Sequence, residues 1–296
     1  MRNGFKTAVL LAFLGGLFMA FGAALGGTSG LVIGLLLGLV FCGGTYWFSD
    51  KLAISSARAK PVTREEDPEL YAMVEDLARR AELPMPRVYV SPEQQPNAFA
   101  TGRSPAKGVV CVTQGIRELL PPDELKGVLA HEMAHVKHRD ILIGSVAAAV
   151  AMAITFLARM LMWGAMFGGD DDDNPLGIVG LLAMVILAPL AAGLIQMAIS
   201  RSREYEADAG GARMLGDGEP LARALEKIDV YAKRIPMVKV NPAQENAFII
   251  NPFQAPPPGG GGGGRGGGRP QKSFGNYFRT HPPTEDRVAR LRAMQF

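Results

Sequence analysis

The stretch "GVLAHEMAHVKHRDILIGSVAAAVAMA" (127–153) joins two kinds of sequence that rarely meet. Its first half carries His131, Glu132 and His135, and on a helix positions i and i+4 share one face, so both imidazoles can reach one metal ion. Its second half has no charged residue after Asp140 and is apolar enough to enter a membrane. The stretch therefore predicts a metal site placed directly against a bilayer.

The composition supports this combination. The chain has 296 residues, of which 48% are hydrophobic, and a mean hydropathy of +0.13. It is more apolar than an ordinary soluble protein and more charged than a bundle of membrane helices, so we expect one soluble domain and several spans. The net charge of +3 comes from scattered Lys and Arg, which predicts no nucleic-acid partner. Cys42 and Cys111 form no CxxC motif, which favours a reducing compartment for the soluble domain.

Four apolar stretches predict transmembrane helices. They cover about residues 8–25, 31–48, 141–162 and 176–199, and each is close to the roughly 20 residues that cross a hydrocarbon core. The first stretch has an alternative reading as a cleaved signal peptide, because it has a basic start and small residues near its end. In that case the second span would still deliver the soluble part to the same side of the membrane.

The distribution of basic residues predicts the orientation of these spans. The basic residues that flank the predicted spans all fall on one side of the membrane: Arg2, Lys6, Lys51, Arg58, Lys60, Lys137, Arg139, Arg201 and Arg203. The two opposite loops, 27–30 and 167–175, contain no Lys or Arg, and the second carries the acidic run 170–173, which we interpret as a solvated loop. The positive-inside rule then places both termini and the soluble domain in the cytoplasm, with the chain crossing the cytoplasmic (inner) membrane several times.

Periodicity predicts the elements of the soluble part. An apolar helical stripe runs through Leu70, Met73, Val74, Leu77 and Ala78. The β-branched runs at 87–90 and 108–116 predict strands around a turn-rich connection. Further helices are expected over 121–138, 201–215, 220–235 and near the C-terminus within 280–294, whereas the glycine-rich tract 256–270 is expected to be a flexible loop.

The HExxH motif at His131, Glu132 and His135 is typical of a zinc hydrolase, with two imidazole ligands and a glutamate beside the metal that serves as general base. A catalytic zinc usually takes three protein ligands and keeps one position open, so a third ligand must come from elsewhere.

The segment "SREYEADAGG" (202–211) offers three carboxylates for that place, Glu204, Glu206 and Asp208. Glu204 and Asp208 share one helical face, so one could bind zinc while the other hydrogen-bonds a ligand histidine. A membrane hairpin between the two segments would bring them side by side.

Four motifs together resemble the HtpX family of membrane metalloproteases, and the resemblance covers nearly the whole chain. They are "HEMAH" (131–135), "SRSREYEADAGG" (200–211), "NAFATG" (97–102) and "THPPTEDRVARL" (280–291). The resemblance implies one Zn²⁺ per subunit, with His131, His135 and Glu204 as ligands and Glu132 as general base. It leaves Asp208 as the carboxylate that orients a ligand histidine. It also implies a role in membrane protein quality control and self-cleavage once zinc is present.

Two further roles are predicted around this site. His281 is a candidate donor to the transition state, and its alternative role is that of a turn residue before two prolines. Asn97, Ala98 and Phe99 are expected on an exposed strand edge that pairs with an extended peptide, and the alternative is an ordinary edge strand.

The expected fold is an α-helical membrane protein with four transmembrane helices and a cytoplasmic α+β metalloprotease domain of the zincin type. The predicted organisation is a transmembrane hairpin (1–50), the first part of the protease domain with the HExxH helix (51–140), a second transmembrane hairpin (141–199), and the second part of the protease domain (200–296).

The predicted function is that of a zinc endopeptidase that cleaves misfolded or damaged membrane proteins at the cytoplasmic face of the bilayer. One alternative is a CAAX prenyl endopeptidase, for which more spans enclosing a chamber would be expected. Another is a non-catalytic membrane scaffold held by zinc. Glu132 argues against the scaffold, because a structural zinc usually has four protein ligands and needs no base beside it.

Overall fold

The computed structural model describes residues 2–143, 146, 150, 154, 201–234 and 282–296. Several predicted features lie outside these residues: most of the third span, the whole fourth span, the acidic run 170–173, the glycine-rich loop 256–270 and His281. The division of the chain at residues 50, 140 and 199 therefore stays a prediction.

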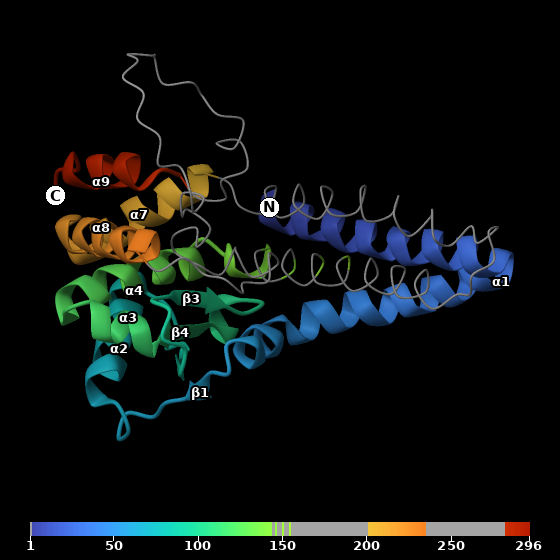
Figure 1. The fold of residues 1–296 in the computed structure, drawn as a ribbon, viewed down its shortest axis with the longest axis horizontal. Helices are drawn as coiled ribbons and strands as arrows, with labels where there is room; N and C mark the ends of the chain where they lie inside the picture. The colour runs from blue at the N-terminus through green and yellow to red at the C-terminus, as the bar shows by residue number, and fades with distance from the viewer. Residues whose placement is uncertain (1, 144–145, 147–149, 151–153, 155–200, 235–281) are drawn as a thin grey trace, which may run out of the picture.

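Helix α1 (Arg2–Ser56) is a hairpin of two apolar arms (Figure 1). The chain reverses at Gly26 and Gly27, where Gly27 has a φ of 55°, a left-handed conformation that glycine adopts without strain. The arms Phe5–Ala23 and Gly26–Phe48 are each long and apolar enough to cross a membrane. The two N-terminal apolar helices are thus confirmed, with a tighter turn than the predicted loop between them.

A further helical segment packs against the first arm. Residues 141–143, 146, 150 and 154 are helical. Their buried side chains form an apolar cluster with the first arm that contains Leu10, Leu14, Phe18, Ile143, Val146, Val150 and Ile154. The described residues after Asp140 are therefore helical and lie beside α1, at the place where the third span was predicted to begin.

The domain that follows α1 contains a four-stranded mixed sheet. Its strands are β1 (Lys60–Pro61), β2 (Arg87–Ser91), β3 (Ala98–Thr101) and β4 (Val109–Thr113). The strand order is β1-β2-β4-β3, in which β2 and β4 are parallel and the other pairs are antiparallel. Strand β3 is therefore an edge strand. A short 3₁₀ turn, Pro105–Lys107, links it to β4.

The helices of this domain begin where local signals place them. In α2 (Pro68–Ala81) the side chain of Asp67 accepts a hydrogen bond from the Leu70 amide, which caps the first turn. Helix α4 (Pro122–Lys137) starts with Pro122 and has two acidic residues in its first turn, where the helix dipole favours negative charge. The remaining helices are α3 (Gln114–Leu119), α7 (Arg201–Leu215), α8 (Glu219–Arg234) and α9 (Thr284–Arg292).

Helix α4 forms the centre of the core, enclosed by α2, α7, α8 and the sheet (Figure 1). Leu129 and Met133 are fully buried, and so is Cys111 on β4. Cys42 and Cys111 are both free thiols. The metal-binding motif is thus placed on the most enclosed helix of the domain, which fixes the positions of its side chains.

Helices α4 and α7 pack at very short range because glycine stands at their crossing. A Cβ atom on Gly211 would lie 2.8 Å from the backbone nitrogen of His131. The preceding Gly210 faces Ala134 in the same way, with a Cβ that would lie 3.0 Å from the Ala134 Cβ. This close approach brings the acidic residues of α7 to the face of α4 that carries the histidines.

Gly211→Ala should therefore destabilise the domain by about 1–3 kcal/mol, because the new methyl group overlaps backbone rather than a flexible side chain. Thermal or denaturant unfolding of the purified protein measures this effect. Gly16→Ala is a matched control, since a Cβ at Gly16 meets nothing within 4 Å. Equal stability of the two variants would contradict the close packing of α4 on α7.

Candidate metal centre

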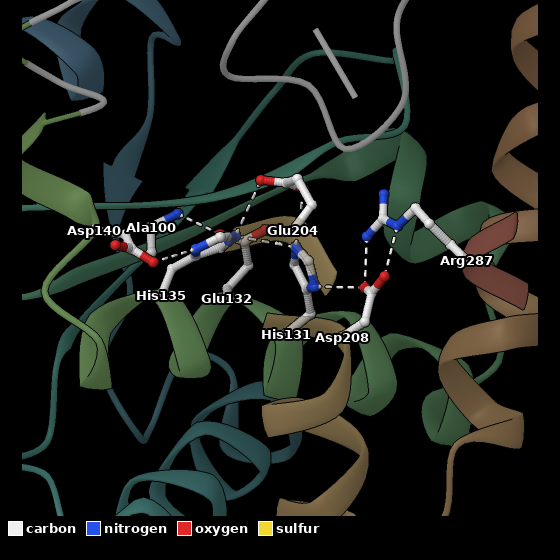
Figure 2. Close-up of polar contacts among 8 residues, drawn as sticks. All are labelled: Ala100, His131, Glu132, His135, Asp140, Glu204, Asp208 and Arg287. Carbon is white, nitrogen blue, oxygen red and sulfur yellow. Dashed lines mark hydrogen bonds and ion pairs between the residues drawn. The ribbon is translucent and has the colours of Figure 1, made fainter. Parts of the chain in front are cut away.

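Helix α4 supplies three polar side chains to one buried site (Figure 2). His131 and His135 lie on one helical face, with Nε2 atoms 3.2 Å apart and ring planes nearly perpendicular. Glu132 is next to them, and its side chain reaches the β3 strand. The HExxH segment thus has the helical arrangement that its spacing predicted.

Helix α7 brings Glu204 to the same place. Its Oε2 lies 3.8 Å from Nε2 of His131, and its Oε1 lies 3.6 Å from Nε2 of His135. Tetrahedral coordination with metal–ligand distances of 2.0–2.1 Å requires ligand atoms about 3.3 Å apart. The three side chains each offer one atom within 4.8 Å of the others, which is close to that requirement. Glu206, the other candidate on this helix, is exposed.

Each histidine has a carboxylate at its other ring nitrogen. Nδ1 of His131 lies 2.9 Å from Oδ1 of Asp208, and Nδ1 of His135 lies 3.3 Å from Oδ2 of Asp140. A proton on each Nδ1 leaves both Nε2 lone pairs directed at Glu204. Three acceptor atoms then converge on one point, an arrangement that a cation stabilises and that fits zinc with its preference for imidazole and carboxylate ligands.

Glu132 is held by the backbone of β3. The Ala100 amide donates a hydrogen bond to its Oε2 at 2.8 Å. Burial raises the pKa of Glu132, an effect that the neighbouring His131 and His135 oppose and that the Glu204 charge reinforces. A carboxylate with a raised pKa is a stronger base, which suits a group that takes up a proton and releases it again.

The acidic surroundings also change His135. Burial by itself lowers the pKa of His135, but the hydrogen bond to Asp140 and the charges of Glu204 and Glu132 outweigh it and raise the pKa to about 9. In the metal-free protein both ring nitrogens of His135 are therefore protonated at neutral pH, and the ring carries a positive charge. The second proton supplies positive charge to a cluster of carboxylates that otherwise needs a metal ion.

Zinc binding should consequently become tighter as the pH rises. Below pH 9 zinc must displace the His135 proton, so the apparent affinity should rise about tenfold per pH unit from about pH 6 and level off near pH 9. The same raised pKa means that the protonated His135 stabilises the metal-free fold below its usual pKa of 6.5, and this contribution is lost as the pH passes 9.

Competition with a chelator across this pH range measures the slope. Asp140→Asn is the informative variant, because loss of its charge should move the plateau to lower pH. An affinity that is constant between pH 6 and 9 would contradict the pKa of about 9 for His135.

Asp208 is itself held by Arg287 of α9. The Arg287 guanidinium donates to both Asp208 oxygens, at 2.8 and 2.7 Å. Burial would raise the pKa of Asp208, but the charge and hydrogen bonds of Arg287 and the contact with His131 hold it well below its usual range. Asp208 is thus an anion that lies between His131 of the candidate metal centre and the buried Arg287 (Figure 2).

The predicted substrate residues lie at and before β3. Asn97 precedes the strand, is buried, and exchanges hydrogen bonds with Thr113. Backbone groups alternate in direction along a strand, and Asn97 and Phe99 face β4. Ala98 and Ala100 therefore direct their backbone groups to the open edge, which agrees with the Ala100 amide reaching Glu132.

Sequence reasoning placed His131, Glu132, His135, Glu204 and Asp208 together, and the structure does so too. It missed Ala100, Asp140 and Arg287. Asp140 had a visible signal, since it is the last charge before the apolar segment and the fifth residue after His135. Arg287 lies in the THPPTEDRVARL motif, as Arg290 does, and nothing in the sequence shows which of the two is buried. A backbone N–H donor such as that of Ala100 cannot be recognised from the residue type.

Comparison with known proteins gives consistent matches. Residues 64–295 match the sequence profile of Peptidase family M48. The chain is 47% identical to "Protease HtpX homolog" of Syntrophobacter fumaroxidans, over 99% of this chain and 100% of that protein. It is 49% identical to "Protease HtpX homolog" of Thermococcus kodakarensis, over 97% of this chain and 94% of that protein. The crystal structure of S. mikatae Ste24p has 20% identity and a TM-score of 0.48, over 98% of this chain and 65% of that chain.

Proposed function

The chain belongs to peptidase family M48 as an HtpX-type metalloprotease, and on this basis we propose that it is a zinc endopeptidase that cleaves misfolded or damaged membrane proteins at the cytoplasmic face of the bilayer. The observation that supports the proposal most directly is the convergence of His131, His135 and Glu204 beside the carboxylate of Glu132. The two apolar arms of α1, joined to the same domain, support a substrate in or near the membrane.

The proposed roles follow from the contacts. His131, His135 and Glu204 would hold one zinc ion, while Asp208 and Asp140 orient the two imidazoles from behind. When bound, zinc would supply a Lewis acid that acidifies water and polarises the scissile carbonyl.

Glu132 is the proposed general base. It takes the proton of the attacking water and later passes it to the leaving amine, which needs a carboxyl with a raised pKa. The Ala100 amide keeps this carboxylate in place before the reaction. We assign His281, immediately before the described C-terminal segment, as the proposed donor to the developing oxyanion.

The edge of β3 is the proposed substrate-binding strand. An extended peptide can pair with the outward backbone groups of Ala98 and with the carbonyl of Ala100, whose amide is already bonded to Glu132. Pairing through backbone atoms gives weak sequence preference, which suits unfolded segments of many proteins. Asn97 and Phe99 would hold this edge in register against β4.

We also propose four spans, with both termini and the protease domain in the cytoplasm. The placement of Lys and Arg supports this, as does the helical segment that follows Asp140 and packs on α1. Cysteine labelling in a background without Cys42 and Cys111 tests it. A cysteine at position 171 should react with an impermeant reagent from outside intact cells, and labelling only after lysis would refute this topology.

The activity is tested with the purified full-length protein. Zinc-dependent digestion of casein and of an unfolded membrane protein, blocked by a chelator and restored by zinc, is the expected result, together with self-cleavage. Cleavage confined to a prenylated C-terminal peptide would instead indicate a CAAX prenyl endopeptidase. Bound zinc without any cleavage would indicate a scaffold.

A further inference from the structure

Arg287 is one of the most completely buried side chains of the domain, with 1% of its surface exposed. Removing a guanidinium from water costs free energy unless its donors are met by well-placed acceptors. This arginine stands on α9, the last helix of the chain, 79 residues after its partner Asp208. A guanidinium buried in the core of a small domain therefore depends on a specific partner.

The contacts of Arg287 lead to the metal centre in two steps. Its Nε and Nη2 donate to Oδ2 and Oδ1 of Asp208 at 2.8 and 2.7 Å, a two-pronged pairing that fixes the carboxylate plane. The same Oδ1 lies 2.9 Å from Nδ1 of His131. Oδ1 of Asp208 therefore contacts both the arginine and the histidine, which links the position of the His131 ring to Arg287 (Figure 2).

We propose that Arg287 is a positioning residue of the metal centre, which acts through Asp208 to fix the ring of His131 for metal binding. The inference rests on the proposed zinc site and extends it to the C-terminal helix. Without Arg287, Asp208 loses both hydrogen bonds on its far side and is free to rotate away from Nδ1. His131 then presents Nε2 to the metal in only part of its conformations.

The buried charges around Arg287 support a role for this residue at the metal centre, beyond packing α9 onto the core. Glu132, Glu204 and Asp208 are all buried within this cluster, and the Arg287 charge acts on each of them. A residue that served only to attach α9 could do so at the surface. Arg292, on the same helix, does this, because it binds Glu219 and Glu226 while remaining 43% exposed.

Arg292 is therefore the matched control for Arg287. Both are arginines of α9 with hydrogen bonds to carboxylates, but only the Arg287 partner contacts a histidine of the site. Arg287→Met should weaken zinc affinity about 10–100-fold, the usual effect of losing a group that orients a metal ligand. Arg292→Met should leave zinc affinity unchanged, even where it lowers thermal stability. Arg287→Lys should recover part of the affinity, since one ammonium can serve one Asp208 oxygen.

The measurements are zinc affinity by competition with a fluorescent chelator, the unfolding temperature of the metal-free protein, and the visible spectrum of the Co²⁺ form. The d–d bands of cobalt report ligand geometry, so Arg287→Met should change them and Arg292→Met should not. If Arg287→Met does not fold, a cycle of Arg287→Lys with Asp208→Asn replaces it, and the two effects on zinc affinity should be less than additive.

Equal zinc affinity and equal cobalt spectra for Arg287→Met and Arg292→Met would overturn the inference, as would strict additivity in the cycle. A wild-type protein that binds no zinc would defeat the proposed function itself. A wild-type protein that binds zinc normally beside an unaffected Arg287→Met variant would defeat only the role of Arg287.

Discussion

Glu132→Gln should abolish peptide cleavage while zinc remains bound. Glutamine has the same shape and its carbonyl oxygen can still accept the hydrogen bond from Ala100, so the site keeps its geometry. It cannot take a proton from water, and loss of a general base typically reduces turnover about 10²–10⁴-fold. Digestion of an unfolded substrate, with zinc content measured on the same samples, separates the two effects.

Glu124→Gln is the control for this variant. Glu124 is a second buried glutamate of α4, eight residues earlier and so about 12 Å along the helix axis. Nζ of Lys227 donates a hydrogen bond to Oε1 of Glu124 at 2.8 Å, and Glu124 does not contact the metal centre. This variant should keep its proteolytic activity. Unchanged turnover in Glu132→Gln would remove Glu132 from the mechanism.

Glu204→Ala should lose zinc. The variant deletes one of three ligand atoms and leaves two imidazoles, so the affinity should fall by more than the roughly 10–100-fold expected for a residue that only orients a ligand. Metal analysis after dialysis, followed by chelator competition, measures the loss.

Glu206→Ala tests whether the effect is specific, because Glu206 is on the same helix and exposed. It should bind zinc as the wild type does. Full metal occupancy in Glu204→Ala would show that the third ligand is a different residue.

The boundary between the domain and the predicted membrane hairpin is part of the metal centre. Helix α4 ends at Lys137, and Arg139 adopts a left-handed φ of 59° before the chain becomes helical again. This turn brings the Asp140 amide to the carbonyl of His135 at 3.0 Å and its carboxylate to the His135 ring. A shift of the residues after Asp140 would therefore displace the His135 ring in the candidate metal centre.

Local patterns were enough to predict much of this arrangement. The apolar stripe of α2 and the extent of α4 depend on neighbouring residues, and both helices were predicted correctly. The HExxH spacing alone predicts two metal ligands and a general base. Spacing did not identify Glu204 as the third ligand. The choice among the three carboxylates came from the resemblance to HtpX-type proteases.

Features that depend on contacts distant in sequence could not be predicted in this way. The placement of β4 between β2 and β3 follows from pairing across the sheet, which no short pattern encodes. Gly211 was not singled out although it meets the His131 backbone, because only the crossing of α4 and α7 makes that position critical. Arg287 reaches the site from the last helix of the chain, and its burial is visible only once α9 packs on α8 and α7.

The most direct test of the account is X-ray absorption at the zinc edge on the purified full-length protein. It should show one zinc per chain with two imidazole nitrogens and carboxylate oxygen at about 2.0–2.2 Å, and the carboxylate contribution should disappear in Glu204→Ala. Sulfur scattering near 2.3 Å, or a zinc environment that Glu204→Ala leaves unchanged, would contradict a centre built from His131, His135 and Glu204.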